Sequence, residues 1–245
     1  YTLRELNLTN EIKGANELKK IKNNISDKFS MELLRFPKYY EELSNEHILV
    51  SEYVIGDSLE DGIKNKSLTW ETLLELFRIH GAFLFGIGTF HGDLHPGNCI
   101  IDPKGNFVFI DNGAICYAPK HVNLTLFKFF EHLSKQEMEE AFDALLGMSN
   151  FEVKGKRLEK YRKEMSKIYF DFERKPVGEQ SLTRIMMKTV KTAVNIAKAE
   201  FGEEAFPIIR ALMYLDGLVI RTHPEVVLIK SMKPYLLEFK NSLEL

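Results

Sequence analysis

The chain has 245 residues, of which 28% are charged and 44% apolar, close to the average for soluble globular proteins. This composition excludes a disordered tail, a collagen-like fibre and a polytopic membrane protein. The formal net charge of -2 gives no indication of bulk nucleic-acid binding. No stretch approaches the roughly 18 uninterrupted apolar residues of a membrane span, and no secretory signal pattern opens the chain.

Two cysteines, Cys99 and Cys116, are too few for a disulfide framework. We therefore expect reduced thiols in a cytoplasmic protein. The sequence begins at Tyr1 rather than Met, and its first residues already resemble the middle of a domain. We expect the chain to be a fragment.

The first part of the chain mixes helix and strand. Residues 3–25 have apolar residues at three- and four-residue intervals, which predicts a helix with Glu11 at the edge of its buried stripe. An extended segment is expected around residues 36–39, because Pro37 disfavours helix at the preceding residue. Residues 47–54 are β-branched and aromatic and predict a second strand. The tract 55–58 then indicates a lobe boundary.

The chain after this boundary is mostly helical, with one hairpin. The spacing of apolar residues predicts a core helix over residues 70–87. A polar loop, His91–Asn98, follows. Residues 99–102 and 106–110 predict two short strands joined by a Pro-Lys-Gly turn, and this hairpin leads to Asp111-Asn112-Gly113.

From His121 onwards the pattern predicts successive helices. The sequence Ser134-Lys-Gln-Glu137 resembles a capping box that opens one of them. Ser181 precedes another, whose apolar face lies opposite a basic face. That basic face consists of Arg184, Lys188, Lys191 and Lys198. Such a face is compatible with an anionic lipid surface or an acidic partner, although it is more often simply solvated.

The loop His91-Gly-Asp93-Leu-His95-Pro-Gly-Asn98, together with Asp111, carries the chemistry. Asp93 and Asn98 are five residues apart, the spacing of the Asp and Asn in the catalytic loop of protein kinases. A phosphoryl-transfer site needs one carboxylate to orient the attacking hydroxyl. It also needs a carboxylate and an amide oxygen to hold Mg²⁺. The set therefore predicts Asp93 as the catalytic residue and Asn98 and Asp111 as metal ligands.

Two other interpretations remain open. Asp93, Asn98 and Asp111 could be ordinary turn and capping residues, since Asp and Asn dominate turns. Alternatively, His91, Asp93 and His95 could form a transition-metal site, although the remaining histidines form no second cluster in the sequence.

HGDLHPGN followed by IDNG resembles the kinase-like superfamily, in which aminoglycoside and choline phosphotransferases can carry nearly the same loop. The flanks are more specific. The segments Glu5-Leu-Asn-Leu-Thr-Asn-Glu11, Phe36-Pro37 and Val50-Ser-Glu-Tyr53 are similar to the UbiB/AarF family of atypical kinases. So are Arg210-Ala-Leu212, Leu215-Asp-Gly217, His223-Pro224 and Pro234-Tyr-Leu236 near the end of the chain.

This resemblance implies roles for individual residues. Glu11 matches the αC glutamate that pairs with the nucleotide-binding lysine, and Glu5 matches the first acid of the ExD motif. His91 matches the first histidine of the kinase loop and would brace it against the Asp111 turn. Backbone groups of Glu52, Tyr53 and Val54 would contact the adenine. The implied cofactors are ATP and Mg²⁺.

The sequence departs from the family in three places. Asn7 stands where the ExD motif has its Asp, and Asn112 replaces the Phe of DFG. The lysine-bearing strand, the nucleotide-covering loop and the KxGQ segment of the family have no counterpart here. We expect this missing part of the N-lobe upstream of Tyr1 or on another chain.

We therefore predict a mostly helical α+β protein with a kinase-like fold. Residues 1–55 would form a partial N-lobe, with an αC-like helix, two strands and the hinge, and residues 56–245 a helical C-lobe. The predicted function is that of an ATPase or a lipid or small-molecule kinase linked to quinone or isoprenoid-lipid metabolism. The alternatives are a non-catalytic pseudokinase scaffold and a phosphotransferase resembling the aminoglycoside or choline enzymes. The predicted partners are a nucleotide and, at a peripheral membrane position, an anionic lipid surface; no nucleic acid is expected.

Overall fold

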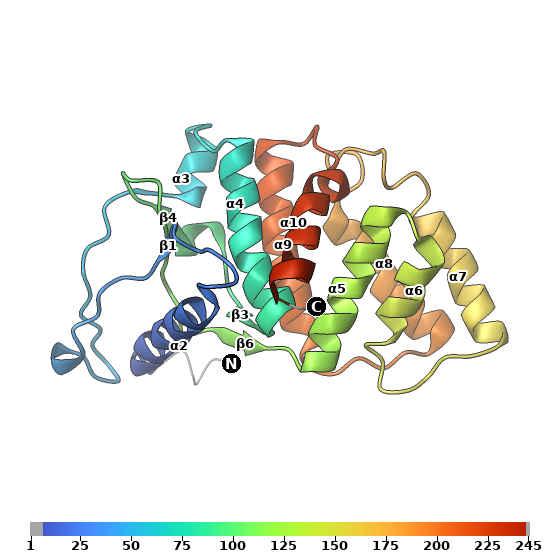
Figure 1. The fold of residues 1–245 in the computed structure, drawn as a ribbon, viewed down its shortest axis with the longest axis horizontal. Helices are drawn as coiled ribbons and strands as arrows, with labels where there is room; N and C mark the ends of the chain where they lie inside the picture. The colour runs from blue at the N-terminus through green and yellow to red at the C-terminus, as the bar shows by residue number, and fades with distance from the viewer. Residues whose placement is uncertain (1–6, 244–245) are drawn as a thin grey trace. The chain divides into compact units, whose positions relative to one another are not determined.

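The computed structural model describes residues 7–243 and divides into two compact units (Figure 1). Unit 1 takes in Tyr1–His80 and Thr89–Tyr117, and unit 2 takes in Gly81–Gly88 and Ala118–Leu245. The lobe boundary expected at residue 55 was placed at a turn-forming tract of the sequence, whereas these units are defined by contacts within the structure. The expected boundary therefore stays a prediction. No helix within the described range is long and apolar enough to cross a membrane.

Unit 1 begins with helix α2, Thr9–Ile25. Its buried face carries apolar residues at helical spacing together with Glu11 and Gly14. The predicted helix began at residue 3. Residues 3–6 lie outside the described range, and residues 7 and 8 are not helical. Just before α2, the Asn7 Oδ1 accepts hydrogen bonds from the Thr9 backbone N–H and the Thr9 hydroxyl, a local side-chain turn that competes with helix at residues 7 and 8.

Two small sheets hold the functional loops. The four-stranded sheet has the order β1-β5-β4-β2, and in the second sheet β3 pairs antiparallel with β6. Their strands are β1 Leu34–Arg35, β2 Asp57–Ser58, β3 Thr89–His91, β4 Cys99–Ile101, β5 Phe107–Phe109 and β6 Ile115–Tyr117. Antiparallel β4 and β5 confirm the predicted hairpin. Its turn is held by the Asp102 carboxylate, which accepts the backbone N–H groups of Lys104 and Asn106.

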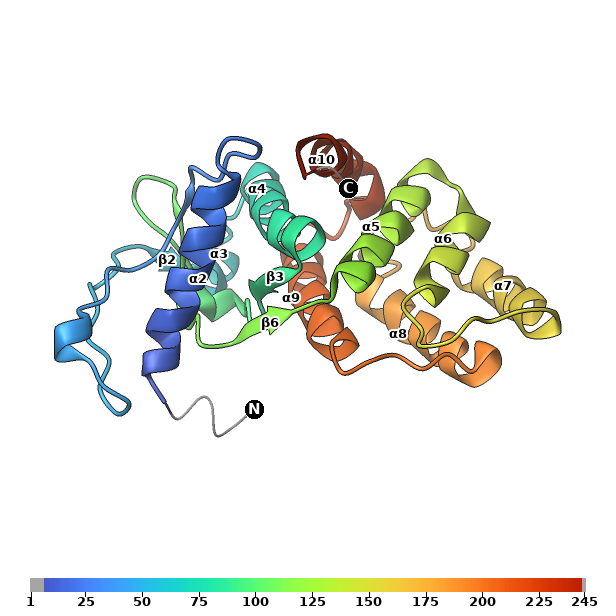
Figure 2. The ribbon, with the colours of Figure 1, turned by 60° about the horizontal axis from the view of Figure 1, so that its bottom comes forward.

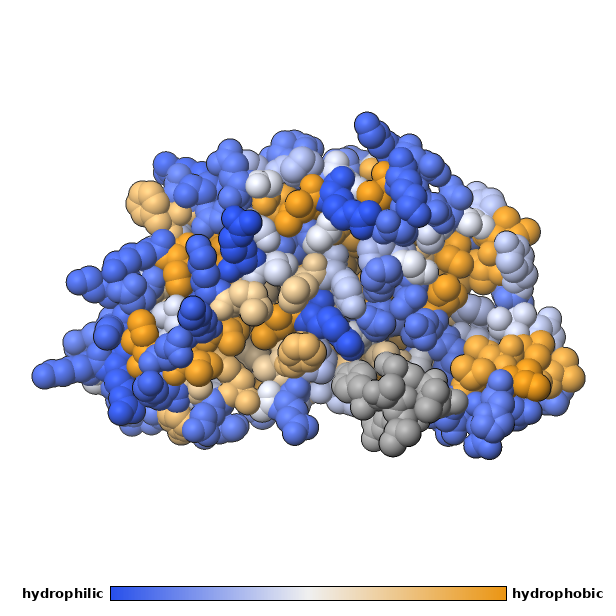
Figure 3. Space-filling model, turned by 180° about the vertical axis from the view of Figure 1, so that it is seen from behind, coloured by the Kyte–Doolittle hydropathy of each residue, from blue (hydrophilic) through white to orange (hydrophobic). Residues whose placement is uncertain are grey.

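The strand predicted over residues 47–54 is wrong as a regular element. The structure has a short 3-10 turn, Glu41–Leu43, and then a single bridge between Tyr39 and Ser51. Side chains take the backbone donors that a strand would offer, since Asn45 accepts the N–H groups of residues 47 and 48 and Ser44 accepts that of residue 50. Ile48 and Leu43 remain more than half exposed. The turn lies at the left of Figure 1 and therefore at the right of Figure 3, which is seen from behind and shows hydrophobic surface there.

The core helix predicted over residues 70–87 is confirmed. Short helix α3, Leu59–Lys64, is capped by the Ser58 hydroxyl, and α4 spans Trp70–Gly81. Helix α4 continues as a π-helical segment, Ala82–Ile87, and ends at Gly88, whose φ of 80° only glycine adopts without strain. In unit 2 the Asn123 amide donates to the Phe85 carbonyl within the π-helical segment.

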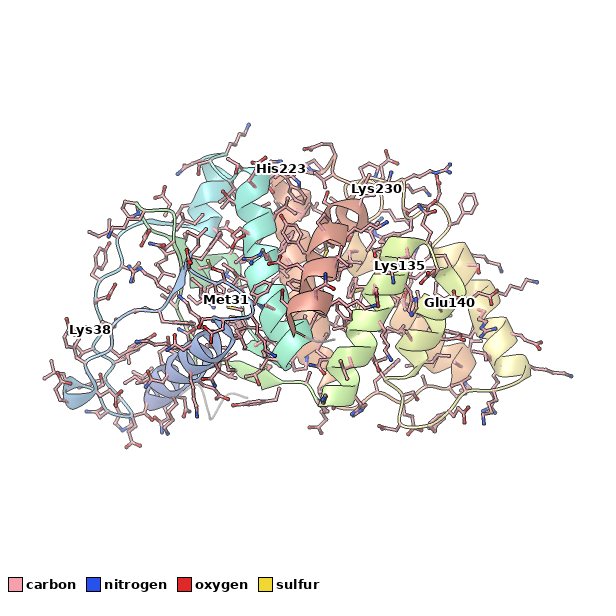
Figure 4. The ribbon with its side chains drawn as sticks, in the orientation of Figure 1. Met31, Lys38, Lys135, Glu140, His223 and Lys230 are labelled. Atoms are coloured by element: carbon pink, nitrogen blue, oxygen red, sulfur yellow. The ribbon has the colours of Figure 1, made fainter. Side chains whose placement is uncertain are left out.

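Unit 2 is a helical assembly. Helices α5 Lys120–Lys135, α6 Met138–Leu146 and α7 Lys156–Ile168 lie side by side in chain order (Figures 1 and 2). They are followed by α8 Leu182–Thr192 with a π-helical end Ala193–Ala197, then α9 Ala205–Thr222 and α10 Leu228–Leu243. Lys135, labelled in Figure 4, shares the Glu131 carboxylate with Lys240, which connects α5 to α10. The expected mostly helical α+β architecture is confirmed.

The capping box predicted at residues 134–137 is wrong. Ser134 lies in the last turn of α5 and its hydroxyl donates to the Glu131 carbonyl. The chain reverses at Gln136, which adopts φ 65°, and α6 begins at Met138 without a side-chain cap. The four residues of the predicted basic face are all exposed; Arg184, Lys188 and Lys191 lie in α8, and Lys198 directly follows its π-helical end. The contact of this face with lipid stays a prediction.

The start of α8 depends on a buried carboxylate from α9. Asp216 is 1% exposed. It accepts hydrogen bonds from the Ser181 hydroxyl at 2.8 Å and from the backbone N–H groups of Leu182 at 3.0 Å and Thr183 at 2.9 Å. The Ser181 hydroxyl in turn accepts the Arg184 N–H. One acid therefore satisfies N-terminal donors of α8 and fixes that helix against α9.

We expect Asp216→Ala to lower the free energy of unfolding of unit 2 by about 2 to 4 kcal/mol, because it removes the acceptor of one buried and two part-buried donors. Asp216→Asn keeps one acceptor oxygen and should cost less. Chemical denaturation followed by circular dichroism measures both changes. The control is Glu225→Ala at an exposed position, which should change stability by less than about 0.5 kcal/mol.

Candidate active site

A cavity of about 550 Å³ in unit 1 brings most of the predicted site residues together. Its lining includes Glu11, Glu52, Tyr53, Val54, Asp93 and Asp111. His91 and Asn98 lie directly behind this lining and are hydrogen-bonded to it. Glu5 lies outside the described residues. Residues far apart in the sequence thus converge on one cavity, as the motif spacing predicts.

The loop that carries Asp93 is fixed by His91. The His91 side chain is buried, its Nε2 lies 3.0 Å from the Ile110 carbonyl, and its Nδ1 accepts the Asp93 backbone N–H at 3.2 Å. This pair of contacts requires a neutral ring protonated on Nε2. Burial, the largest influence, lowers the pKa of His91 and keeps it neutral. His91 therefore connects the Asp93 loop to the residue just before Asp111.

The same contacts argue against a transition-metal site on this loop. Both ring nitrogens of His91 are already used, and the His95 Nδ1 accepts the Gly97 N–H at 3.1 Å. Within residues 7–243, no three His, Cys, Asp or Glu side chains gather as a metal cluster. The candidate metal ligands are instead the Asp111 carboxylate and the Asn98 amide.

Asn98 lies between the two aspartates. Its Nδ2 donates to the Asp93 carbonyl at 2.9 Å and lies 3.4 Å from the Asp111 Oδ2. Asp111 adopts φ 56°, a left-handed conformation that Asp tolerates better than most residues. The candidate donor set consists of oxygen atoms of Asn98 and of the exposed Asp111, and Asp93 lies on the same loop as Asn98. The donor set fits a hard cation such as Mg²⁺ and lacks the soft ligands of zinc or copper.

Glu11 accepts three hydrogen bonds at the edge of the cavity. It is 8% exposed, although it is charged. Its Oε1 accepts the Tyr39 hydroxyl at 2.6 Å and the Asn112 amide at 3.1 Å, and its Oε2 accepts the Gly113 N–H at 2.8 Å. Burial and the neighbouring Glu11 charge raise the pKa of Tyr39, so its hydroxyl stays a donor. The sequence analysis did not predict a role for Tyr39. It singled out Asn112 because this residue replaces the Phe of the DFG motif.

Close approach of α2 to the Asp111–Gly113 turn depends on Gly14. A Cβ at this position would overlap the Asn112 carbonyl oxygen. Gly14 lies one helical turn after Glu11, on the same face of α2. Glycine at residue 14 therefore permits the distance at which Glu11 reaches Asn112 and Gly113.

The side chain of Glu52 is engaged in hydrogen bonds within the protein. Its carboxylate accepts Arg35 Nη1 at 2.7 Å and the Lys38 N–H at 3.0 Å, and these hydrogen bonds, with Arg35 first, lower the pKa of Glu52. Arg35 also bonds Asp102 at 3.0 Å. Burial opposes ionisation of Asp102, but bonds from Asn106, Arg35 and Lys104 lower its pKa to about 2. Tyr53 is 90% exposed. Contact of this segment with adenine stays a prediction.

Comparison with known proteins identifies the family. The sequence model of the ABC1 atypical kinase-like domain matches residues 2–145, more than half of the chain. The chain belongs to the ABC1 atypical kinase-like family. The predicted resemblance to the UbiB/AarF atypical kinases and the expected kinase-like fold are thereby confirmed.

Curated relatives of this ABC1 domain agree. It is 25% identical over 219 residues to the "Probable protein kinase UbiB" of Blochmanniella pennsylvanica, covering 84% of this chain and 38% of the relative. It is 23% identical over 248 residues to the protein of the same name from Vibrio vulnificus, covering 97% and 43%. The "Uncharacterized protein in hydrogenase 1 5'region" of Clostridium pasteurianum is 21% identical, covering 96% and 43%. The chain thus spans about two-fifths of the length of these relatives.

A solved structure with a similar fold is "The complex structure of Rv3197-erythromycin from Mycobacterium tuberculosis". It is 17% identical, has a TM-score of 0.45, and the match covers 88% of this chain and 59% of that chain.

We expect Gly14→Ala to lower the stability of unit 1 by about 1 to 3 kcal/mol, because the new methyl group forces α2 away from the Asp111 turn. Gly217→Ala in α9 is the matched control, since a Cβ there meets nothing within 4 Å. That control should be neutral or stabilising by about 0.5 to 1 kcal/mol through helix propensity. Denaturation midpoints at constant m-value measure the difference; equal effects of the two substitutions would contradict the close approach.

The ABC1 domain should also lose stability in mild acid through His80. This α4 side chain is fully buried against Phe90, and neither ring nitrogen bonds to any described residue. Burial lowers the pKa of His80 to about 3, below its value in the unfolded chain of about 6.5. The unfolded state therefore binds more protons below pH 6.5, and folding should weaken by about 2 kcal/mol between pH 7 and pH 5.

His80→Leu should remove this share of the pH dependence and leave stability at pH 7 unchanged or higher, because it deletes two unbonded polar atoms. Urea denaturation at a series of pH values measures it, with exposed His121→Gln as the control. An unchanged slope in His80→Leu would show that His80 does not titrate on unfolding.

Proposed function

We propose that this ABC1 domain binds Mg-ATP in the cavity of unit 1 and acts as an ATPase or as a lipid or small-molecule kinase. The observation that carries the proposal is that Asp93 and Asp111 line the same cavity, while the Asn98 amide donates hydrogen bonds to the Asp93 backbone carbonyl and the Asp111 carboxylate. The cavity is large enough for a nucleotide, since small-molecule sites run from about 300 to 1,000 Å³.

The charges of the cavity support a requirement for a divalent cation. Its lining in the described part of the chain contains the carboxylates of Glu11, Glu52, Asp93 and Asp111 and no basic side chain. A triphosphate would be repelled by such a lining unless a cation bound with it. When bound, Mg²⁺ would neutralise charge on the phosphate oxygens. Asn98 and Asp111 are the residues that would hold it.

In this mechanism the remaining residues orient the reacting groups. Asp93 would accept a hydrogen bond from the attacking hydroxyl or water and orient it. Neutral His91 keeps the Asp93 loop and the Ile110–Asp111 backbone at a fixed separation. The Glu52 side chain is held by Arg35, and its backbone N–H donates to the Lys38 carbonyl, so the backbone of residues 53 and 54 at the cavity wall would contact the adenine.

The substrate class is part of the proposal. The UbiB/AarF resemblance implies quinone or isoprenoid-lipid metabolism, and the acceptor would be a small molecule or lipid of that chemistry. The family match favours this assignment over the aminoglycoside and choline phosphotransferases. A panel of isoprenoid phenols, aminoglycosides and choline, followed by ADP release, tests the choice.

A second candidate is a nucleotide-binding scaffold without turnover. One observation favours it: the Glu11 carboxylate already accepts three hydrogen bonds within the chain, so it does not depend on a lysine partner to be satisfied. Asn112 in place of the DFG phenylalanine points the same way. A domain that binds Mg-ATP but releases no ADP with any acceptor would be this scaffold.

We expect Mg-ATP to raise the thermal midpoint of the full-length protein. At a concentration about 100-fold above the dissociation constant, ligand binding stabilises the native state by about 2.7 kcal/mol, or about 5 to 10 °C. Asp111→Ala should abolish the shift. Asp93→Asn should keep the shift and lose ADP release, since Asp93 acts on the acceptor.

The control is Asp27→Asn, an exposed acid after α2 that should behave as the wild type in both measurements. An equal shift in wild type and Asp111→Ala would contradict the proposed metal site. No shift with either ATP alone or Mg-ATP in the wild-type protein would contradict nucleotide binding altogether.

A further inference from the structure

Four residues of unit 1 form what we call the Glu11 cluster: Glu11, Tyr39, Asn112 and Gly113. They come from α2, from the segment after β1 and from the turn after β5. Both carboxylate oxygens of Glu11 are engaged, one by the Tyr39 hydroxyl and the Asn112 amide and the other by the Gly113 N–H. The cluster therefore joins α2 to the residues that directly follow Asp111.

Asn112 contributes chemistry that a phenylalanine could not. Its side chain is fully buried, and its Nδ2 donates both to Glu11 and to the Phe109 carbonyl at 2.9 Å. One amide thus connects the end of β5 to α2 across the turn. An apolar residue here would leave the Glu11 Oε1 with the Tyr39 hydroxyl as its one remaining donor in the cluster.

Tyr39 contributes the shortest bond of the cluster, 2.6 Å to the Glu11 Oε1, and its hydroxyl also lies 3.4 Å from the Asn112 Nδ2. Hydrogen bonds to a carboxylate are stronger than those between neutral groups. The Tyr39 side chain lines the cavity beside Glu11 and Asp111. Tyr39 therefore holds Glu11 from the cavity side, while Asn112 and Gly113 hold it from the turn.

Asp111 itself adopts a left-handed backbone conformation. For a residue other than glycine this conformation has an energetic cost, and it persists where the surroundings determine it. The two residues that follow Asp111 are those that the Glu11 carboxylate binds. His91 contacts the carbonyl of the residue before it. The conformation of Asp111 is thus held from both sides.

We propose that Tyr39 and Asn112 are positioning residues, which hold the Glu11 carboxylate on the turn and so set the orientation of Asp111 toward a bound cation. The inference rests on the proposed function of the cavity. In this chain the partners of the Glu11 carboxylate are then the Tyr39 hydroxyl and the Asn112 amide. The orientation of Asp111 is then established before any nucleotide binds.

The first test is amide hydrogen exchange of residues 110–114 in the full-length protein without nucleotide. Tyr39→Phe removes one hydroxyl and leaves the ring, and we expect the Gly113 amide to exchange about 3 to 10 times faster. Asn112→Leu, of similar volume, should have the same effect. Tyr40→Phe, the adjacent tyrosine, which makes no contact with Glu11, is the matched control and should exchange like the wild type.

The second test measures the Mg²⁺ concentration that gives half-maximal ATP binding. Tyr39→Phe should raise this concentration about 3- to 10-fold, while the amount of ATP bound at saturating Mg²⁺ stays as in the wild type. In a Glu11→Gln background, Tyr39→Phe should add little, because both substitutions act through the same carboxylate. A purely structural role of Tyr39 would not produce this selective dependence on Mg²⁺.

The outcomes separate the two proposals. Exchange at Gly113 equal to that of Tyr40→Phe overturns the inference, and so does faster exchange with an unchanged Mg²⁺ requirement. A wild-type protein that binds no Mg-ATP overturns the proposed function instead. In that case the exchange measurement, which needs no nucleotide, still decides whether the cluster holds the turn.

Discussion

Unit 1 depends on the contact between helix α2 and the turn that carries Asp111. Gly14 lets the two backbones approach, and Glu11, one helical turn earlier, supplies the carboxylate that satisfies the donors of the turn. A buried carboxylate would be costly without such partners. The same contact therefore offsets the desolvation cost of Glu11 and fixes the backbone next to Asp111, a predicted metal ligand. Neither element would keep its position if the other moved.

Local patterns in the sequence predicted the parts of the site that depend on local structure. The loop from His91 to Asn98 and the hairpin after it are short, contiguous motifs, and their spacing alone places Asp93 and Asp111 at the same end of a hairpin. The partners of Glu11 could not be obtained in this way. Tyr39 is 28 residues from Glu11 and Asn112 is 101 residues away. Nothing in the local pattern marks either as its partner.

The two wrong predictions have different physical causes. Strand propensity at residues 47–54 and the capping pattern at 134–137 are real local preferences. In the first, Asn45 and Ser44 offer their own oxygen atoms to the backbone donors and prevent a regular ladder. In the second, α5 continues through Ser134 because residues before it bury a continuous apolar face, including Phe129, Phe130 and Leu133. Tertiary packing outweighs a cap that contributes about 1 kcal/mol.

The acids of the cavity divide into two kinds, and this division explains how an acidic cavity can be stable without a ligand. Glu52 is neutralised by Arg35, and Glu11 is held by a hydroxyl and two amides. Asp93 and Asp111 come from loop positions, and Asp111 both accepts the Asn98 amide at 3.4 Å and is exposed to solvent, where water also supports its charge. Displacing that water with a triphosphate removes the support and adds like charge. A cation is therefore the one addition that lowers the energy of both aspartates and of the phosphates at the same time.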